Sequence, residues 1–217
     1  MKKFIDFFDP SVVTVPIHII GCGALGSTTA IMLARCGITD IHLWDFDTVE
    51  EHNIANQQYV WSDVDELKTV ALTKHYKAIT PRAQVVQHGA WDDDTLRGIV
   101  ILALDHIDTR KRILNYHYHK QTISAMLDIR MRLKDATHHA ADWSNDRQKV
   151  SLKESMNFTH EEAMANTPVS ACNMTLSIMP TVQTVCSVTV ANLINYFKGQ
   201  PLSPLVLVNP FDFIMEG

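Results

Sequence analysis

The stretch Val15-Pro16-Ile17-His18-Ile19-Ile20-Gly21-Cys22-Gly23-Ala24-Leu25-Gly26 decides how this chain folds. Its apolar β-branched part predicts a buried strand over residues 15–20, and the pattern after the glycines predicts a helix over 25–36. In such a strand–turn–helix unit the first glycine permits a tight turn, the second lets backbone approach a phosphate, and the third allows close helix packing. The chain has only 8 glycines in 217 residues, so this cluster predicts a nucleotide site. The alternative is a glycine turn in a Rossmann-like fold whose pocket is empty.

Strands and helices alternate through the first half of the chain. Further strands are predicted over residues 41–44, 84–87 and 99–104, and a second helix over 66–79, ending before Pro81. Strands separated by helices of this length form right-handed βαβ units. The predicted fold class is therefore α/β, a Rossmann-like doubly wound, mostly parallel sheet with antiparallel additions in the C-terminal half.

The second half gives weaker local signals. We expect a helix to about residue 120, a strand over 122–127, an irregular polar region to about 157, and a crossover loop near 156–177. Apolar residues spaced by threes and fours predict a helix over 182–197, which Gly199 ends. No charged residue occurs from Ala163 to Phe197, a run long enough to span a bilayer. Its asparagines, prolines and hydroxyl residues favour burial in the α/β domain over a membrane span.

Composition excludes several classes of function. The chain has 19 Lys and Arg against 24 Asp and Glu, a net charge of −5, and no basic stripe, which argues against nucleic acid as a partner. Its 4 cysteines contain no C-x-x-C pair, so neither a disulfide framework nor zinc is expected. Acidic residues soon follow Lys2 and Lys3, so no signal peptide is predicted and the expected location is cytoplasmic.

The glycine loop and Asp45, which follows the second strand, equally suit ATP and NAD. A carboxylate there can accept hydrogen bonds from ribose hydroxyls in either case. Several further motifs follow: Asp45-Phe46-Asp47-Thr48-Val49, then Asn53-Ile54-Ala55-Asn56-Gln57, then Lys68 thirteen residues before Pro81, then Asp105-His106-Ile107-Asp108-Thr109-Arg110. Together with the glycine loop, this set resembles the ThiF/MoeB family, the prokaryotic relatives of ubiquitin-activating enzymes. The resemblance is in register over about residues 17–110 and looser over 163–199.

The resemblance implies a single adenylation domain over residues 1–217. Its nucleotide-binding half would cover about 15–127, and its crossover loop and C-terminal helix about 156–199. Such an enzyme binds ATP with Mg²⁺ and adenylylates the C-terminal carboxylate of a ubiquitin-like or sulfur-carrier protein or of a peptide, and a homodimer is expected. The residues implied in nucleotide binding are Gly21, Gly23, Ala24, Gly26, Asp45, Asp47, Asn53, Asn56, Gln57, Lys68 and Asp105.

The residues suit the implied chemistry. Attack of a carboxylate on the α-phosphate builds negative charge, which Lys68 can stabilise. Asp105 can hold Mg²⁺, although it can also serve as a helix N-cap. Asn53 and Asn56 can donate side-chain amides to phosphate oxygens. Cys172, at a position where some family members form a thioester, is a candidate nucleophile, and a buried structural role is its alternative.

Two departures from the family pattern keep other functions open. Asn56 stands where the family commonly has arginine, and the N-terminal arginine that larger members lend across a dimer interface has no match. A catalytically inactive nucleotide-binding or dimerising partner is therefore one alternative. An NAD-dependent oxidoreductase is another, but it leaves the positions of Asn53, Lys68 and Asp105 unexplained. A tRNA-modifying relative is disfavoured by the lack of a basic surface.

Overall fold

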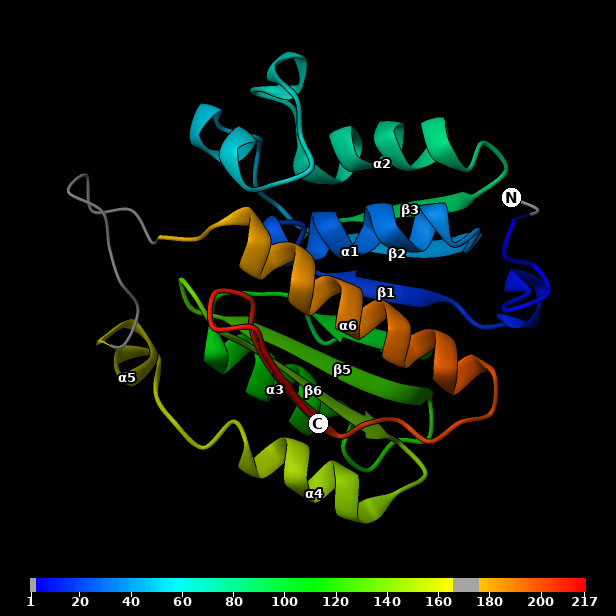
Figure 1. Ribbon diagram of the computed structural model, residues 1–217, viewed down its shortest axis with the longest axis vertical. Helices are drawn as coiled ribbons and strands as arrows, with labels where there is room; N and C mark the ends of the chain where they lie inside the picture. Colours follow the sequence, from blue (N-terminus) through cyan, green and yellow to red (C-terminus); the bar gives the residue numbers. More distant parts are fainter. Residues whose placement is uncertain (1–2, 166–175) are drawn as a thin grey trace.

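The apolar run before the glycine loop forms β1 (Ile17–Ile20), whose four residues are all buried because the strand lies inside the sheet. The computed structural model describes residues 3–165 and 176–217 (Figure 1). The sheet has the strand order β3-β2-β1-β4-β5-β6-β7-β8. Its first five strands are parallel: β3 (Gln84–His88), β2 (Asp40–Trp44), β1, β4 (Gly98–Leu102) and β5 (Ile123–Met131). The last three are antiparallel additions: β6 (Ala136–Asp142), β7 (Leu205–Asn209) and β8 (Ile214–Glu216).

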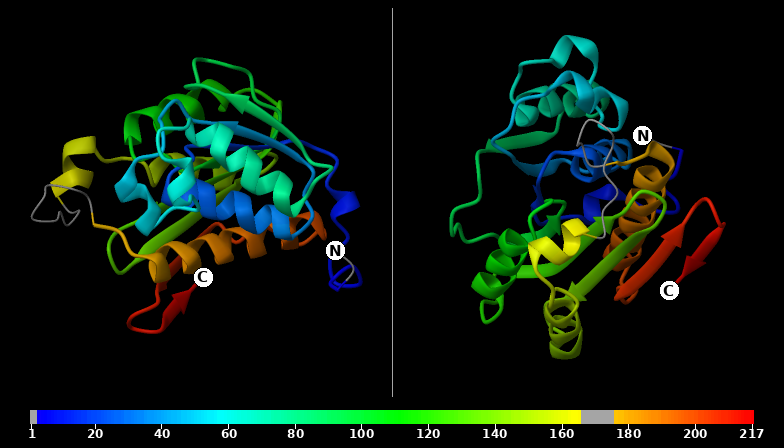
Figure 2. Two further views of the ribbon diagram at one scale, coloured as in Figure 1. Left: turned by 90° about the horizontal axis from the view of Figure 1, so that it is seen from above. Right: turned by 90° about the vertical axis from the view of Figure 1, so that its left-hand side faces the viewer.

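Helices cover the sheet from both sides, as Figure 2 shows. One face packs against α1 (Ala24–Arg35), α2 (Lys68–Ile79) and α6 (Met179–Phe197). The other face packs against α3 (Ile107–His117) and α4 (Asp146–Glu154). The short helix α5 (His160–Ala165) follows α4 beside the carboxyl ends of the strands. The strand order from β3 to β5 is that of a doubly wound nucleotide-binding fold, which confirms the predicted fold class.

The uncharged helix α6 packs against its own chain. It lies beside α1 (Figure 1), where the Cys186 thiol donates to the backbone oxygen of Leu25 over 3.3 Å. Its apolar stripe is buried there and on β5, β6 and β7. This stripe is therefore not available as a dimer interface, and the predicted homodimer stays a prediction. In the described part of the chain no helix has the length and apolar character needed to cross a bilayer.

The region up to residue 157 that we expected to be irregular contains β6 and α4, so that prediction was wrong. β6 is a polar strand, ATHHAAD, whose position is fixed by pairing with both β5 and β7 rather than by its own composition. Asn145 begins α4, since its side chain accepts from the N–H groups of Arg147 and Gln148. The expected crossover loop likewise contains α5 in its first part.

Candidate nucleotide-binding site

The glycine loop between β1 and α1 has one role for each glycine. Gly21 has φ of +93°, and a Cβ there would lie 2.7 Å from the backbone oxygen of Ala103. A Cβ on Gly26 would lie 1.8 Å from the oxygen of Gly21, so the start of α1 is pressed against the loop. A Cβ on Gly23 would meet nothing within 4 Å. Gly21 and Gly26 are therefore required by packing, whereas Gly23 faces open space where a ligand can approach the backbone.

Asp45, directly after β2, is held by backbone donors. Its Oδ2 accepts from the N–H of Cys22 over 2.6 Å, and its Oδ1 accepts from the N–H of Asp47 over 2.9 Å. Burial raises the pKa of Asp45, and the two N–H groups oppose this shift. The carboxylate thus joins the loop after β1 to the loop after β2 and keeps a fixed position at the rim of the cleft, where its remaining lone pairs suit ribose hydroxyls.

Lys68 is the first residue of α2, and its side chain is almost fully buried. Its Nζ pairs with Asp47 Oδ2 at 2.9 Å. The buried Tyr59 hydroxyl, which donates to the backbone oxygens of Cys22 at 2.7 Å and Lys68 at 3.3 Å, ties this helix end to the glycine loop. The Lys68 ammonium is therefore held close to the glycine loop by its ion pair with Asp47 and by the hydrogen bonds of Tyr59.

Three amide side chains come from the short 3₁₀ helix η2 (Glu51–Ala55) and the residues after it. Asn53 is 6% exposed, and its Oδ1 accepts from the N–H of Glu50 over 3.0 Å. Asn56 donates from Nδ2 to the hydroxyl of Ser177. The buried Oε1 of Gln57 has no hydrogen-bond partner among the described residues. This segment therefore brings amide groups to the cleft, one of them with an unused acceptor.

Asp105 follows β4, so it stands at the same edge of the sheet as the glycine loop and Asp45. Its side chain is exposed, and the N-cap of α3 is His106, not Asp105. The alternative role of Asp105 as a helix cap is therefore wrong. An exposed carboxylate at the end of a parallel strand fits a Mg²⁺ ion bound together with a nucleotide.

A single cleft of about 1770 Å³ joins these groups. Of the predicted site residues, the cleft is lined by Gly21, Gly23, Ala24, Asp45, Asp47, Asn53, Asn56, Gln57, Lys68 and Asp105. Gly26 supports the loop from behind and is buried. Cys172 lies outside the described residues. The motifs quoted from four separated parts of the sequence thus meet at one place.

The described cysteines do not supply a nucleophile. Cys22 and Cys186 are buried and Cys36 is half-buried. Burial raises the pKa of each of these three thiols, so they stay protonated at neutral pH. Among the described residues no group of three or more His, Cys, Asp or Glu side chains is arranged to hold a metal ion.

Several cleft residues were not predicted as functional. They include Thr137 and His139 of β6 and Phe158 of the segment after α4. His138 and His139 are neighbours on β6. On β6 the two rings point to opposite faces: His138 bonds Thr189 and Asn192 of α6, whereas His139 lines the cleft. The period of two along a strand would have separated them, had β6 been recognised.

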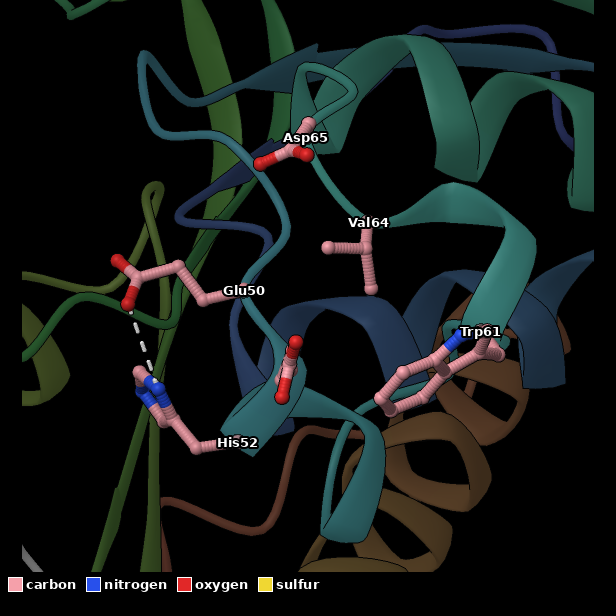
Figure 3. A pocket seen from close by; sticks show the side chains of 6 residues that line it. Glu50, His52, Trp61, Val64 and Asp65 are labelled. Atoms are coloured by element: carbon pink, nitrogen blue, oxygen red, sulfur yellow. Dashed lines mark ion pairs between the residues drawn. The ribbon is translucent and has the colours of Figure 1, made fainter.

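A second pocket of about 660 Å³ lies on the outer side of η2 (Figure 3). Glu50, Glu51 and Asp65 line it together with His52, which pairs with Glu50 at 3.4 Å. Three carboxylates and one histidine disfavour a polyphosphate ligand. The larger cleft is therefore the better candidate for a nucleotide.

The strand order and the loop after β1 define a Rossmann-type α/β protein of nucleotide-binding architecture. The chain belongs to the ThiF family, whose family model matches residues 11–213.

Curated relatives match a shorter part of the chain. Ubiquitin-like modifier-activating enzyme 5 of Dictyostelium discoideum is 36% identical over 72 residues, which make up 33% of this chain and 19% of that protein. The protein of the same name from Oryza sativa subsp. japonica is 40% identical over 65 residues, or 30% of this chain and 15% of its own length. The matched part therefore spans less than a fifth of these relatives.

Solved structures match nearly the whole chain at low identity. Escherichia coli MccB in complex with ATP has a TM-score of 0.76 and 15% identity, and the match covers 95% of this chain and 64% of that one. PaaA has a TM-score of 0.70 and 17% identity, with 93% and 62% covered. At these identities the likeness shows the fold, and this chain spans less than two thirds of either protein.

Proposed function

We propose that this protein uses ATP to adenylylate a C-terminal carboxylate of a peptide or of a ubiquitin-like or sulfur-carrier protein, releasing pyrophosphate. The observation that carries the proposal is the meeting of Lys68, Asn53 and Asp105 with the glycine loop in one cleft. Hydride transfer from a nicotinamide needs no cation, amide and carboxylate grouped beside the phosphate-binding loop. Transfer of a nucleotidyl group needs such a cluster, because negative charge develops on the phosphoryl oxygens and on the leaving pyrophosphate.

Each of these residues has a definable task in such a reaction. The open backbone at Gly23 and the N-terminus of α1 receive phosphate oxygens, and Asp45 holds the ribose. Lys68 exchanges part of its pairing with Asp47 for the phosphates and offsets their charge. Asp105 would hold Mg²⁺, which would offset the negative charge of the polyphosphate and so reduce its repulsion of the approaching carboxylate. The remaining contribution of the protein is orientation of the two reactants.

Similar proteins support the acceptor class. E. coli MccB, which shares the fold, has been solved with ATP and with MccA, and the curated relatives are named for activation of ubiquitin-like modifiers. A carboxylate at the end of a peptide or small protein is the chemistry that these names share. The identity of the acceptor is set by residues beyond those that bind ATP.

ATP–pyrophosphate exchange with a candidate acceptor tests the proposal. Calorimetric titrations with ATP·Mg²⁺ and with NAD are run beside it, and we expect binding of ATP only. Exchange that requires both Mg²⁺ and an acceptor with a free C-terminal carboxylate supports the enzyme. ATP binding without exchange, across ubiquitin-like, sulfur-carrier and peptide acceptors, supports the non-catalytic partner instead, for which Asn56 in place of arginine is the specific observation.

Cys172 is proposed to take the acyl group in a second step. Its thiolate would attack the acyl carbon of the adenylate, the bond to AMP would break, AMP would leave, and the thiol proton would pass to solvent. Cys172→Ala should then retain exchange and lose an adduct that dithiothreitol cleaves. An adduct that persists in this variant contradicts the proposal.

The homodimer is likewise proposed from the family resemblance. Analytical ultracentrifugation should give twice the mass of the chain. A monomer at the concentration used for activity measurements would contradict it.

A further inference from the structure

The cleft extends beyond the nucleotide residues over β5 and β6. The groups assigned to ATP stand after β1, β2 and β4, whereas β5 and β6 lie on the other side of β4 in the sheet. The carboxyl end of β5 is adjacent to that of β4, where Asp105 stands. An acceptor that brings its carboxylate to the α-phosphate beside Asp105 therefore has this second side of the cleft available for its tail.

One face of β5 and β6 carries a row of polar side chains into this part of the cleft. Asp128 lies opposite His139, and Arg130 lies opposite Thr137. Directly opposed residues in antiparallel strands share a face, so these four side chains form one strip. His139 and Thr137 line the cleft together with Arg130 and Arg132.

The floor of this strip holds more positive than negative charge. The buried carboxylate of Asp128 pairs with both Arg110 and Arg130. Burial by itself would raise the pKa of Asp128, but the two guanidinium groups hold it below its ordinary value, so it is ionised. Burial and the charge of Arg130 lower the pKa of His139 to about 4, so its ring is neutral at neutral pH. One carboxylate thus faces two arginines, which favours an anion nearby.

Arg132 has the weakest ion pair among the cationic side chains on the β5–β6 side of the cleft. Among the basic side chains lining the cleft in the described part of the chain, Lys68, Arg112 and Arg130 pair with carboxylates at 2.5 to 2.9 Å, and Arg110 pairs with Asp128. Arg132 reaches its partner Asp135 only at 4.0 Å, and its side chain is 61% exposed. Its guanidinium can therefore receive a carboxylate at little cost, and its fork geometry suits one.

We propose that the β5–β6 side of the cleft is a carboxylate-binding subsite for the tail of the acceptor and that Arg132 contacts this carboxylate. The subsite rests on the proposed function for the identity of its occupant. Apolar lining from Met131, Ala136 and Phe158 gives the rest of an extended tail a surface to cover. The carboxylate is either the reacting C-terminus or an acidic side chain a few residues before it.

Peptide arrays that display free C-termini test the subsite without requiring turnover. Short peptides are offered in the presence of ATP·Mg²⁺ in three matched forms: with glutamate in the last few positions, with glutamine there, and with a C-terminal amide. Weaker binding of the glutamine form assigns the carboxylate to a side chain, and weaker binding of the amide form assigns it to the terminus. We expect one of these two losses, of about two- to fivefold, in the wild-type protein.

The same arrays are probed with Arg132→Ala, Arg132→Lys and Arg132→Glu. Arg132→Ala should abolish the difference between the matched forms, Arg132→Lys should keep part of it, and Arg132→Glu should reverse it in favour of neutral peptides. Arg147→Glu is the control, because Arg147 is exposed on α4 and does not line the cleft, so it makes the same change in net charge elsewhere. Binding that does not depend on Arg132, or that falls equally in the control, overturns the subsite.

Failure of the subsite and failure of the proposed function are distinguishable. Arg132-dependent binding without exchange for any acceptor contradicts the proposed reaction and leaves the subsite intact. Exchange with an acceptor whose KM and kcat do not change in Arg132→Ala contradicts the subsite alone.

Discussion

On the β1–β2 side of the cleft the carboxylate of Asp45 is held by backbone N–H groups, whereas on the β5–β6 side the carboxylate of Asp128 is held by the two guanidinium groups of Arg110 and Arg130. Asp45 accepts from two backbone N–H groups, and the glycine loop is fixed by packing against β4 and α1. Arg110 and Arg130 share the single carboxylate of Asp128 as their counter-charge, and each also donates to backbone oxygens. We therefore expect a substitution on the β1–β2 side to weaken function, and a substitution of Asp128 to leave two guanidinium groups without a counter-charge.

The largest effect should come from Asp128→Asn, which leaves the buried guanidinium of Arg110 and the partly buried one of Arg130 against a neutral amide. We expect the free energy of unfolding to fall by about 3–5 kcal/mol, the cost of breaking a buried ion pair on one side only. Urea denaturation followed by circular dichroism measures it. Asp92→Asn is the control, because Asp92 pairs with Arg112 in an exposed position. Equal stability of the two variants would contradict the described network.

Lys68→Ala should act on catalysis rather than on folding. We expect exchange to fall about 10²–10³-fold, the usual result of removing one group that stabilises charge in a transition state. Lys74→Ala is the matched control on the same helix, because Lys74 is exposed and pairs with Glu66. If both variants lose the same activity, Lys68 has no special role at the phosphates.

Alanine at two of the glycines should separate packing from ligand binding. A Cβ on Gly26 collides with the oxygen of Gly21, so Gly26→Ala should cost about 1–3 kcal/mol of stability. Gly23→Ala should leave the thermal unfolding temperature unchanged, since its Cβ points into open space. It should weaken the binding of ATP in calorimetric titration, because the Cβ occupies space where the phosphates approach the backbone. ATP affinity that is unchanged in Gly23→Ala would place the phosphates away from this loop.

The smallest effect, when it is measured over one pH unit, concerns the protonation of a buried histidine. Burial, followed by the charge of His139, lowers the pKa of His138 from 6.5 to about 4. Between pH 4 and pH 6.5 the unfolded state therefore binds more protons than the folded state. The free energy of unfolding that neutral His138 contributes is complete above pH 6.5 and is lost as the pH falls toward 4. We expect a slope of about 1.4 kcal/mol per pH unit from this residue. His138→Gln, which can still bond Thr189 and Asn192 of α6, should flatten the slope in urea titrations; an unchanged slope would assign the loss to other groups.

The same contrast explains what could be predicted from sequence. The strand before the glycines, α1, β2 and β4 carry strong local signals, so these elements were predicted correctly. Most of the site residues named from Gly21 to Asp105 line one cleft, and their binding of a nucleotide stays a prediction. β6 was missed because its sequence, ATHHAAD, has neither an apolar run nor a regular alternation of apolar and polar residues, and its position depends on pairing with β5 and β7. His139 could be assigned to the cleft only after this pairing was known. Cys172 and the homodimer stay predictions.

The packing of α6 on α1 has a consequence for the order of events during synthesis. The two helices are far apart in the chain, yet α6 closes part of the core on which α1 and the glycine loop rest. At roughly 5–20 residues added per second, on the order of ten seconds pass between completion of α1 and completion of α6. During that interval the newly made nucleotide half exposes the apolar surface that α6 later covers, so the emerging chain should depend on chaperones until its C-terminal part is released from the ribosome.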